Sequence, residues 1–137
     1  MFERILVAVD GSARSKKTIA IAVDLAGRYG SIVTVLHVRE YERYEGSDVD
    51  MGPPISAEQL VDHALSIFRE AGVDAKGEVR RVGSGDTPEQ IVEVAELSEA
   101  NLLILGSRGM SEWKSLLLGG VASKVVGQAR CPVLLVR

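Results

Sequence analysis

LLILGSRGMSEWKSLLLGGVASKVV, residues 102–126, begins as a predicted buried strand and ends as a predicted helix. Its first four residues are all apolar, as expected for a strand that is covered on both faces. After the second pair of glycines, the apolar residues from Val121 onward recur at helical spacing. A buried strand followed by a helix is the repeating unit of a parallel sheet, because parallel strands need a long crossover between them.

The same succession of strand and helix extends through the rest of the chain. Apolar or alternating runs predict five strands, over residues 4–9, 31–38, 75–82, 101–106 and 132–137. Helical spacing of apolar residues predicts helices over residues 15–29, 56–72, 87–95 and 121–129. Gly30 and Gly72 are expected to end the first two helices, and Ser56 with Gln59 has the spacing of a capping box. Thr87-Pro88 repeats that capping signal, whereas residues 39–54 are polar and are interpreted as a loop.

This strict alternation predicts an α/β fold, a doubly wound parallel sheet with helices on both faces. With five strands, the winding usually reverses beside the first strand, although the sequence alone leaves the strand order open. If the strands lie in the order 3-2-1-4-5, Asp10 and Gly106 emerge side by side at the carboxyl edge, where such sheets bind ligands. The charged third strand, residues 75–82, is then an edge strand.

Composition limits the possible partners. The chain has 137 residues, of which 46% are hydrophobic and 26% charged, so we expect one domain over 1–137. A net charge of -3 does not favour nucleic acid as a partner. No apolar run approaches the roughly 20 residues that cross a bilayer, and Asp10 ends the first run too early for a signal peptide. Cys131 is alone and cannot form an internal disulfide. These features together predict a cytoplasmic protein with no membrane partner.

Glycines at both ends of the segment after the fourth strand indicate an anion site. They are Gly106, Gly109, Gly119 and Gly120. Glycine permits close approach of the main chain to a ligand, and backbone N–H groups at a helix N-terminus bind phosphate. Any one of these glycines has a structural role more often than a functional one, but together they favour a polyphosphate site. Arg108 and Lys114 add positive charge there, whereas the P-loop and dinucleotide-binding motifs are both missing.

Several short motifs occur together in the chain. VAVDGS closes the first strand, LHV closes the second, G-x2-G-x9-G starts at Gly106, and CPVLLVR forms the last strand. The combination, which covers nearly the whole chain, resembles the universal stress protein family. This resemblance implies an adenine nucleotide alpha-hydrolase-like fold that binds ATP and usually forms homodimers.

The resemblance also implies a set of nucleotide-binding residues: Ala8, Val9, Asp10, Val38, Gly106, Arg108, Gly109, Gly119, Gly120 and Val121. The first three would surround the nucleotide, and Asp10 would lie near the ribose or a phosphate-bound Mg²⁺ or Mn²⁺. Val38 would contact adenine. The residues from Gly106 to Gly109 would wrap the ribose and phosphates, and those from Gly119 to Val121 would donate backbone hydrogen bonds to the phosphate chain.

Two positions have competing interpretations. The family motif has serine or threonine where this chain has Gly120, so one hydroxyl donor to phosphate is missing, a loss of about 0.5–1.5 kcal/mol. Ser123, one turn later, is a candidate replacement, although serine is also an ordinary first-turn residue. An aspartate before Gly-Ser, such as Asp10, also commonly caps a turn or a helix.

The expected function is regulatory ATP binding. No pair of residues looks like a dedicated general base and nucleophile, so we expect hydrolysis to be slow at most. The alternative is a dimeric interaction module of the same fold that binds no nucleotide, in agreement with Gly120. A phosphotransfer receiver is excluded, because Val82-Gly83 stands where its phosphorylated aspartate would end the third strand.

Some remaining features are interpreted as structural. The run PVLLV is apolar on both faces at a predicted sheet edge, so we expect two copies to pair there in a homodimer. His37 and His63 have no metal-ligating neighbours at useful spacing. Asp48 and Asp50 are assigned to a solvated loop, since the spacing around them does not fit a calcium loop.

Overall fold

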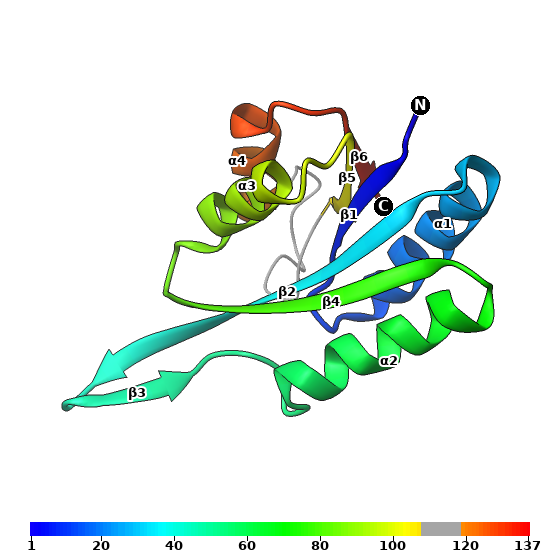
Figure 1. Ribbon diagram of the computed structural model, residues 1–137. Helices are drawn as coiled ribbons and strands as arrows, with labels where there is room; N and C mark the ends of the chain where they lie inside the picture. The colour runs from blue at the N-terminus through cyan, green and yellow to red at the C-terminus, as the bar shows by residue number, and fades with distance from the viewer. Residues whose placement is uncertain (108–118) are drawn as a thin grey trace.

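The computed structural model describes residues 1–107 and 119–137, which form one six-stranded sheet with helices on both faces (Figure 1). The elements are β1 (Arg4–Ala8), α1 (Ala13–Tyr29), β2 (Ile32–Tyr44), β3 (Ser47–Asp50), α2 (Ala57–Glu70), β4 (Asp74–Gly83), α3 (Thr87–Leu97), β5 (Leu102–Gly106), α4 (Gly120–Gln128) and β6 (Val133–Val136). Helices α1 and α2 cover one face of the sheet, and α3 and α4 cover the other (Figure 1). The predicted α/β class is confirmed.

The parallel strands lie in the order β4-β2-β1-β5-β6, which is the predicted order 3-2-1-4-5. β1 therefore lies between β2 and β5, and its neighbours come from opposite halves of the chain. The winding reverses at this point, so the ends of β1 and β5 open on the same edge. The charged strand β4 pairs with β2 at the opposite side of the sheet from β6, as predicted.

The prediction of a loop over residues 39–54 was wrong. β2 continues to Tyr44, turns through Glu45 and Gly46 at φ 48° and 80°, and pairs antiparallel with β3. Both turn residues have positive φ, as in the two-residue turns that best fit the twist of a hairpin. Tyr41 pairs with Asp50 and also with Gly83, so β3 occupies the edge of β2 that β1 leaves unpaired. The sheet thus has six strands instead of five, and the hairpin projects from its end (Figure 1).

The sheet separates two apolar cores because successive side chains in a strand point to opposite faces. Ile5 and Val7 of β1 pack with α1 and α2, where Phe68 is fully buried. Leu6 of β1 packs with Leu36 and the residues of α3 and α4. Burial of a side chain such as Phe68 contributes about 1.5–3 kcal/mol. A central strand that is buried on both faces explains the continuous apolar run at the start of the chain.

The helix ends follow the predicted signals in two cases and depart from them in a third. Gly30 ends α1 with φ 63°, and the capping box of Ser56 and Gln59 begins α2. Thr87, however, does not cap α3: the N-cap residue is Asp86, and the Thr87 hydroxyl donates to a carboxylate oxygen of Glu40 instead. Tertiary contact with β2 has therefore replaced the local cap.

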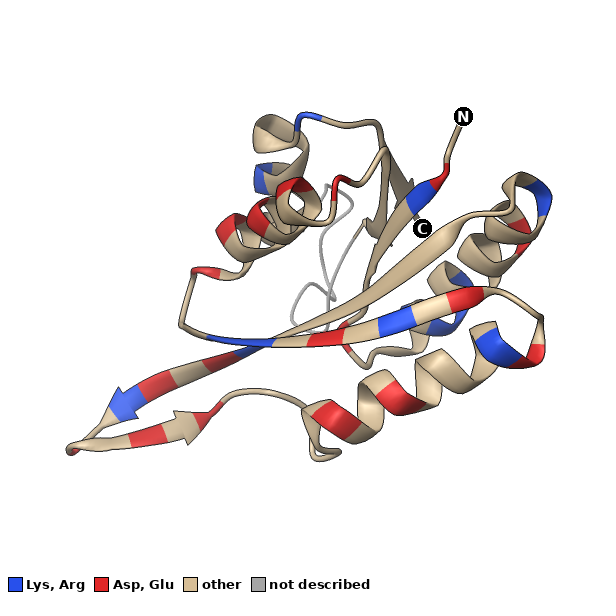
Figure 2. Ribbon diagram, viewed as in Figure 1, with Lys and Arg blue, Asp and Glu red and all other residues tan. Residues whose placement is uncertain are grey.

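Charged residues lie away from the centre of the sheet. Figure 2 shows them along the far half of β2, along β3 and β4, and on the exposed sides of the helices, whereas β5 carries none. Within the described part of the chain, none of the helices has the length and apolar character needed to cross a membrane.

Candidate functional site

A cavity lies where the carboxyl ends of β1, β2 and β5 meet the first turns of α1, α3 and α4. Its described lining residues are Ala8, Val9, Asp10, Ser12, Arg14, Ser15, Thr18, Leu36, Val38, Thr87, Ile91, Leu105, Gly106, Val121 and Ala122. Six predicted site residues are among them: Ala8, Val9, Asp10, Val38, Gly106 and Val121. The carboxyl end of β5 and the turn that follows β1 therefore share one cavity, as the predicted strand order requires.

The other predicted residues differ in position. Gly119 and Gly120 begin α4 beside the cavity, but the N–H of Gly119 donates to the carbonyl of Ser107 at 2.8 Å. This N–H is therefore used within the protein in the described structure, and a phosphate contact of Gly119 stays a prediction. Val121 and Ala122 follow in the first turn of α4, where N–H groups have no intrahelical partner. Arg108, Gly109 and Lys114 lie outside the described residues.

Asp10 organises the turn between β1 and α1. Its Oδ1 accepts hydrogen bonds from the N–H of Ser12 and the hydroxyl of Ser15, both at 2.9 Å. The N–H of Asp10 donates in turn to the Ser15 hydroxyl oxygen at 3.2 Å. The turn-capping interpretation of Asp10 is therefore correct, and the residue lines the cavity at the same time. One carboxylate can do both because a carboxylate has two oxygens with several acceptor positions.

The start of α1 contributes polar groups that the sequence analysis missed. Ser12 and Arg14 both line the cavity. The Ser12 hydroxyl is buried and has no hydrogen-bond partner among the described residues. The positive end of the α1 dipole lies in the same place, so this wall favours an anion. Serine and arginine are ordinary residues for a first helical turn, and hence no sequence signal marked them.

The facing wall of the cavity is apolar. It contains Leu36 and Val38 from one face of β2, Ile91 from α3, Leu105 from β5 and Ala122 from α4. Such a wall suits a flat apolar ring, and the polar wall across the cavity suits the charged part of the same ligand. The arrangement can therefore hold an elongated molecule with one apolar and one anionic end.

Comparison with known proteins agrees with this architecture. A family model described as the universal stress protein family matches residues 1–137. The chain belongs to the universal stress protein family. It is 35% identical to a universal stress protein of Thermus aquaticus over the full length of both chains. A solved universal stress protein of Archaeoglobus fulgidus matches the fold with a TM-score of 0.77 at 27% identity, covering 100% of each chain.

A second solved structure comes from the same organism. This universal stress protein of Archaeoglobus fulgidus, crystallised in complex with dAMP, is 26% identical and has a TM-score of 0.73. The match covers 99% of the present chain and 98% of that relative. The length and fold of the present universal stress protein therefore correspond to those of a relative with a bound nucleotide.

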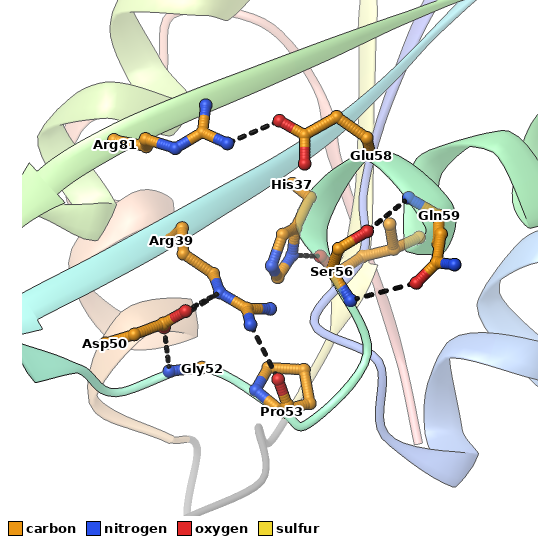
Figure 3. A network of polar contacts seen from close by, with 10 residues as sticks. His37, Arg39, Asp50, Gly52, Pro53, Ser56, Glu58, Gln59 and Arg81 are labelled. Atoms are coloured by element: carbon orange, nitrogen blue, oxygen red, sulfur yellow. Dashed lines mark hydrogen bonds and ion pairs between the residues drawn. The ribbon is translucent and has the colours of Figure 1, made fainter.

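His37 supports the cavity of this universal stress protein from the opposite face of the sheet. The proton of His37 Nδ1 is donated to the carbonyl oxygen of Val9 at 2.8 Å (Figure 3). His37 is only 3% exposed, and this burial lowers the pKa of its imidazole. A neutral ring with one fixed donor holds the end of β1, in agreement with the structural role expected for this histidine.

Arg39, which lies beside His37, forms hydrogen bonds with the segment that follows the hairpin turn (Figure 3). Its guanidinium donates to Asp50 at 2.9 Å and to the carbonyl of Pro53 at 2.6 Å, although Arg39 is only 4% exposed. The hydrogen bond from Arg39 lowers the pKa of Asp50. The assignment of Asp50 to a solvated loop was therefore wrong. Gly52 has no side chain where the Arg39 guanidinium passes, so the chain can cross directly over it.

Proposed function

We propose that this universal stress protein is a regulatory protein that binds an adenine nucleotide, with ATP as the ligand. Its main support is the cavity in which Asp10 and Gly106, from two adjacent strand ends, lie with Val38 and Val121. The dAMP complex of the 26% identical relative supports the same class of ligand. The family match extends over residues 1–137, which we treat as a single nucleotide-binding domain.

The two walls of the cavity suit the two ends of the ligand. The base would lie against Val38 and Ile91, and the phosphates would extend toward the first turns of α1 and α4. Arg14 would contribute charge, and the N–H groups of Gly120 and Val121 would donate to phosphate oxygens. In this arrangement Gly106 gives the ribose room close to the main chain.

A divalent cation would bind with the phosphates. The described residues contain no group of three or more histidine, cysteine, aspartate or glutamate side chains that could hold a metal ion by themselves, without a bound nucleotide. Mg²⁺ characteristically binds through one or two carboxylates together with substrate phosphates, and Mn²⁺ accepts the same oxygen donors. Asp10 is the one carboxylate among the described lining residues, so it would be the protein ligand.

Hydrolysis would be slow. A general base must reach the attacking water, and the described lining residues include no histidine or glutamate. Asp10 already accepts two hydrogen bonds through Oδ1, so that oxygen is occupied within the protein. Binding rather than turnover is therefore the expected activity.

The test is to identify and then to titrate the nucleotide. The purified protein is denatured and the released small molecules are identified by mass spectrometry, and emptied protein is then titrated with labelled ATP. Saturable binding with a micromolar Kd supports the proposal. Absence of binding at millimolar ATP contradicts it and supports the alternative, a dimeric interaction module that binds no nucleotide.

We also propose a homodimer that joins two β6 strands. β6 lies at the end of the strand order, pairs with β5, and carries three partly exposed apolar residues, Val133, Leu134 and Leu135. An unpaired edge of this kind is a template for a second copy. Light scattering should give twice the mass of one chain. The carbonyls of Pro132 and Val136 accept hydrogen bonds from Leu103 and Ser107, so the N–H of Leu135 points to the open edge of β6. Leu135→Pro removes this donor and should shift the protein toward the monomer, and a wild-type monomer would contradict the proposal.

A cytoplasmic location completes the proposal. Cys131 is the one cysteine of the chain, and burial raises the pKa of its thiol, so it is poorly suited to oxidation. Fractionation of cells that express the protein should place it with cytoplasmic markers. Recovery with secreted proteins would contradict this assignment.

A further inference from the structure

Thr87 lies in the cavity wall near Val38, and its hydroxyl proton is already used. Thr87 is the first residue of α3, and its Oγ1 donates to Oε2 of Glu40 at 2.5 Å. The N–H of Gly85 donates to the same oxygen at 3.2 Å. Since Oε2 accepts from a backbone N–H, it acts as an acceptor toward Thr87 as well. Glu40 thereby fixes the direction in which the Thr87 proton points.

The fixed proton determines what Thr87 can offer to a ligand. A threonine hydroxyl has one proton and two acceptor lone pairs. Because the Thr87 hydroxyl donates its proton to the hydrogen bond with Glu40, Oγ1 can only accept a hydrogen bond from a molecule in the cavity. A ligand group that is only a hydrogen-bond acceptor, such as a carbonyl oxygen, cannot bond to these lone pairs. It would lose its hydrogen bonds to water and gain none from Oγ1.

The position of Thr87 corresponds to the base end of the cavity. Leu36, Val38 and Glu40 alternate along β2 and so point to one face of the sheet, the face that α3 covers. Ile91 lies one turn after Thr87 on α3 and lines the same cavity. The hydroxyl of Thr87 is therefore a polar group at the rim of the apolar wall.

We propose that Thr87, oriented by Glu40, selects the nucleobase by accepting a hydrogen bond from an exocyclic amine. This inference depends on the proposed nucleotide site. Adenine has an amine at position 6, whereas guanine and hypoxanthine have a carbonyl oxygen there. A site with a fixed hydrogen-bonding group discriminates strongly against an analogue that leaves the group unpaired. The Thr87 and Glu40 pair would thus distinguish adenine from 6-oxopurines.

The test compares ATP with ITP, which differ at position 6 of the base and in the adjacent ring proton. Dissociation constants are measured by calorimetry for the wild type, Thr87→Val and Thr87→Ser. The wild type should bind ATP about tenfold or more tightly than ITP. Thr87→Ser keeps the hydroxyl and should keep this ratio. Thr87→Val keeps the shape and removes the acceptor, so the ratio should approach one through weaker binding of ATP.

Removal of Glu40 tests the orientation itself. In Glu40→Ala the Thr87 hydroxyl can turn its proton toward the base, so ITP should bind more tightly than it does to the wild type. Circular dichroism confirms that each variant is folded. If the wild type prefers ATP and Thr87→Val keeps the full preference, or if the wild type binds both equally, this inference is wrong while nucleotide binding stands. If the wild type binds neither, the proposed function itself fails.

Discussion

The carbonyl oxygen of Val9 accepts a hydrogen bond from Nδ1 of His37 across the end of the sheet, over 2.8 Å. The N–H of Val9 donates to the carbonyl of Leu36, the preceding residue of β2, at 2.9 Å. Both backbone groups of Val9 are thus held by β2 just where β1 leaves the sheet. Because Val9 and Asp10 line the cavity, a buried histidine outside that cavity fixes part of its wall.

Stability should depend on pH through His37. Burial lowers the pKa of His37 in the folded state below 6.5, so the unfolded chain takes up this proton first as pH falls. The free energy of unfolding should therefore decrease from about pH 6.5 downward until the folded pKa is reached. His37→Asn, which keeps an N–H donor and does not titrate, should lose this slope. Urea unfolding between about pH 8 and pH 5 measures it.

His63 provides the matched control for this experiment. It lies exposed on α2, so His63→Asn should keep the pH dependence of the wild type. Asp50 does not interfere, because its pKa is lowered from 3.8 and its contribution is lost only at more acidic pH. Equal slopes in the wild type and His37→Asn would show that His37 does not cause the effect.

Arg14 should act on the phosphates. Arg14→Ala should weaken ATP binding about tenfold and leave adenosine binding nearly unchanged, since a charge-assisted hydrogen bond to phosphate is lost. Titration with both ligands measures the two effects. Arg28→Ala is the control on the same helix, because Arg28 pairs with Asp24 in the last turns of α1. Equal weakening of ATP and adenosine would exclude a specific phosphate contact.

Gly120→Ser should strengthen ATP binding. The substitution supplies the hydroxyl that the family motif has at this position, one residue into α4. One additional hydrogen bond to phosphate corresponds to about two- to tenfold tighter binding. Titration of both proteins with ATP measures the difference. Unchanged affinity would mean that Ser12, Arg14 or another group already saturates that phosphate oxygen.

Removal of Asp50 from its ion pair with Arg39 should destabilise the protein more than replacement of Arg39. Asp50→Ala leaves a buried guanidinium without its carboxylate and should destabilise the protein by about 1–3 kcal/mol. Arg39→Met removes the buried charge, fills similar space, and should cost less. Asp48→Ala is the control, since Asp48 is exposed in the same hairpin. Urea unfolding measures all three, and a larger loss in Arg39→Met would contradict the expectation.

The central strands β1 and β5 could be predicted from sequence because they are buried. Leu6 and Val7 point to opposite faces of the sheet and both are fully buried, so β1 must be apolar throughout. The antiparallel hairpin gave no such signal. Its turn contains Glu45 at positive φ, where asparagine or glycine is usual, and its flanking residues are charged. Cross-strand hydrogen bonds and the Arg39 ion pair hold this segment, and neither leaves a hydrophobic pattern.

Only the cavity residues that belong to sequence motifs at strand ends could be predicted. The strand order brought Asp10 and Gly106 together, since both follow directly from strand ends. Thr87 could not be recognised in this way. Its sequence context is that of a helix cap, and its contact with Glu40 depends on how α3 packs against β2. Groups that enter a site through helix packing have no local signature. Arg14 was missed for a different reason, because arginine is an ordinary residue in a first helical turn.

The length of β2 has a mechanical consequence. One strand of 13 residues contains Val38, which lines the cavity, and continues without interruption to Tyr44 at the tip of the hairpin. Because β2 pairs with β4 up to Tyr41 and with β3 from Tyr41 to Tyr44, a displacement of the hairpin tip would be transmitted along one hydrogen-bonded strand to Val38. The exposed hairpin is therefore mechanically coupled to the wall of the cavity.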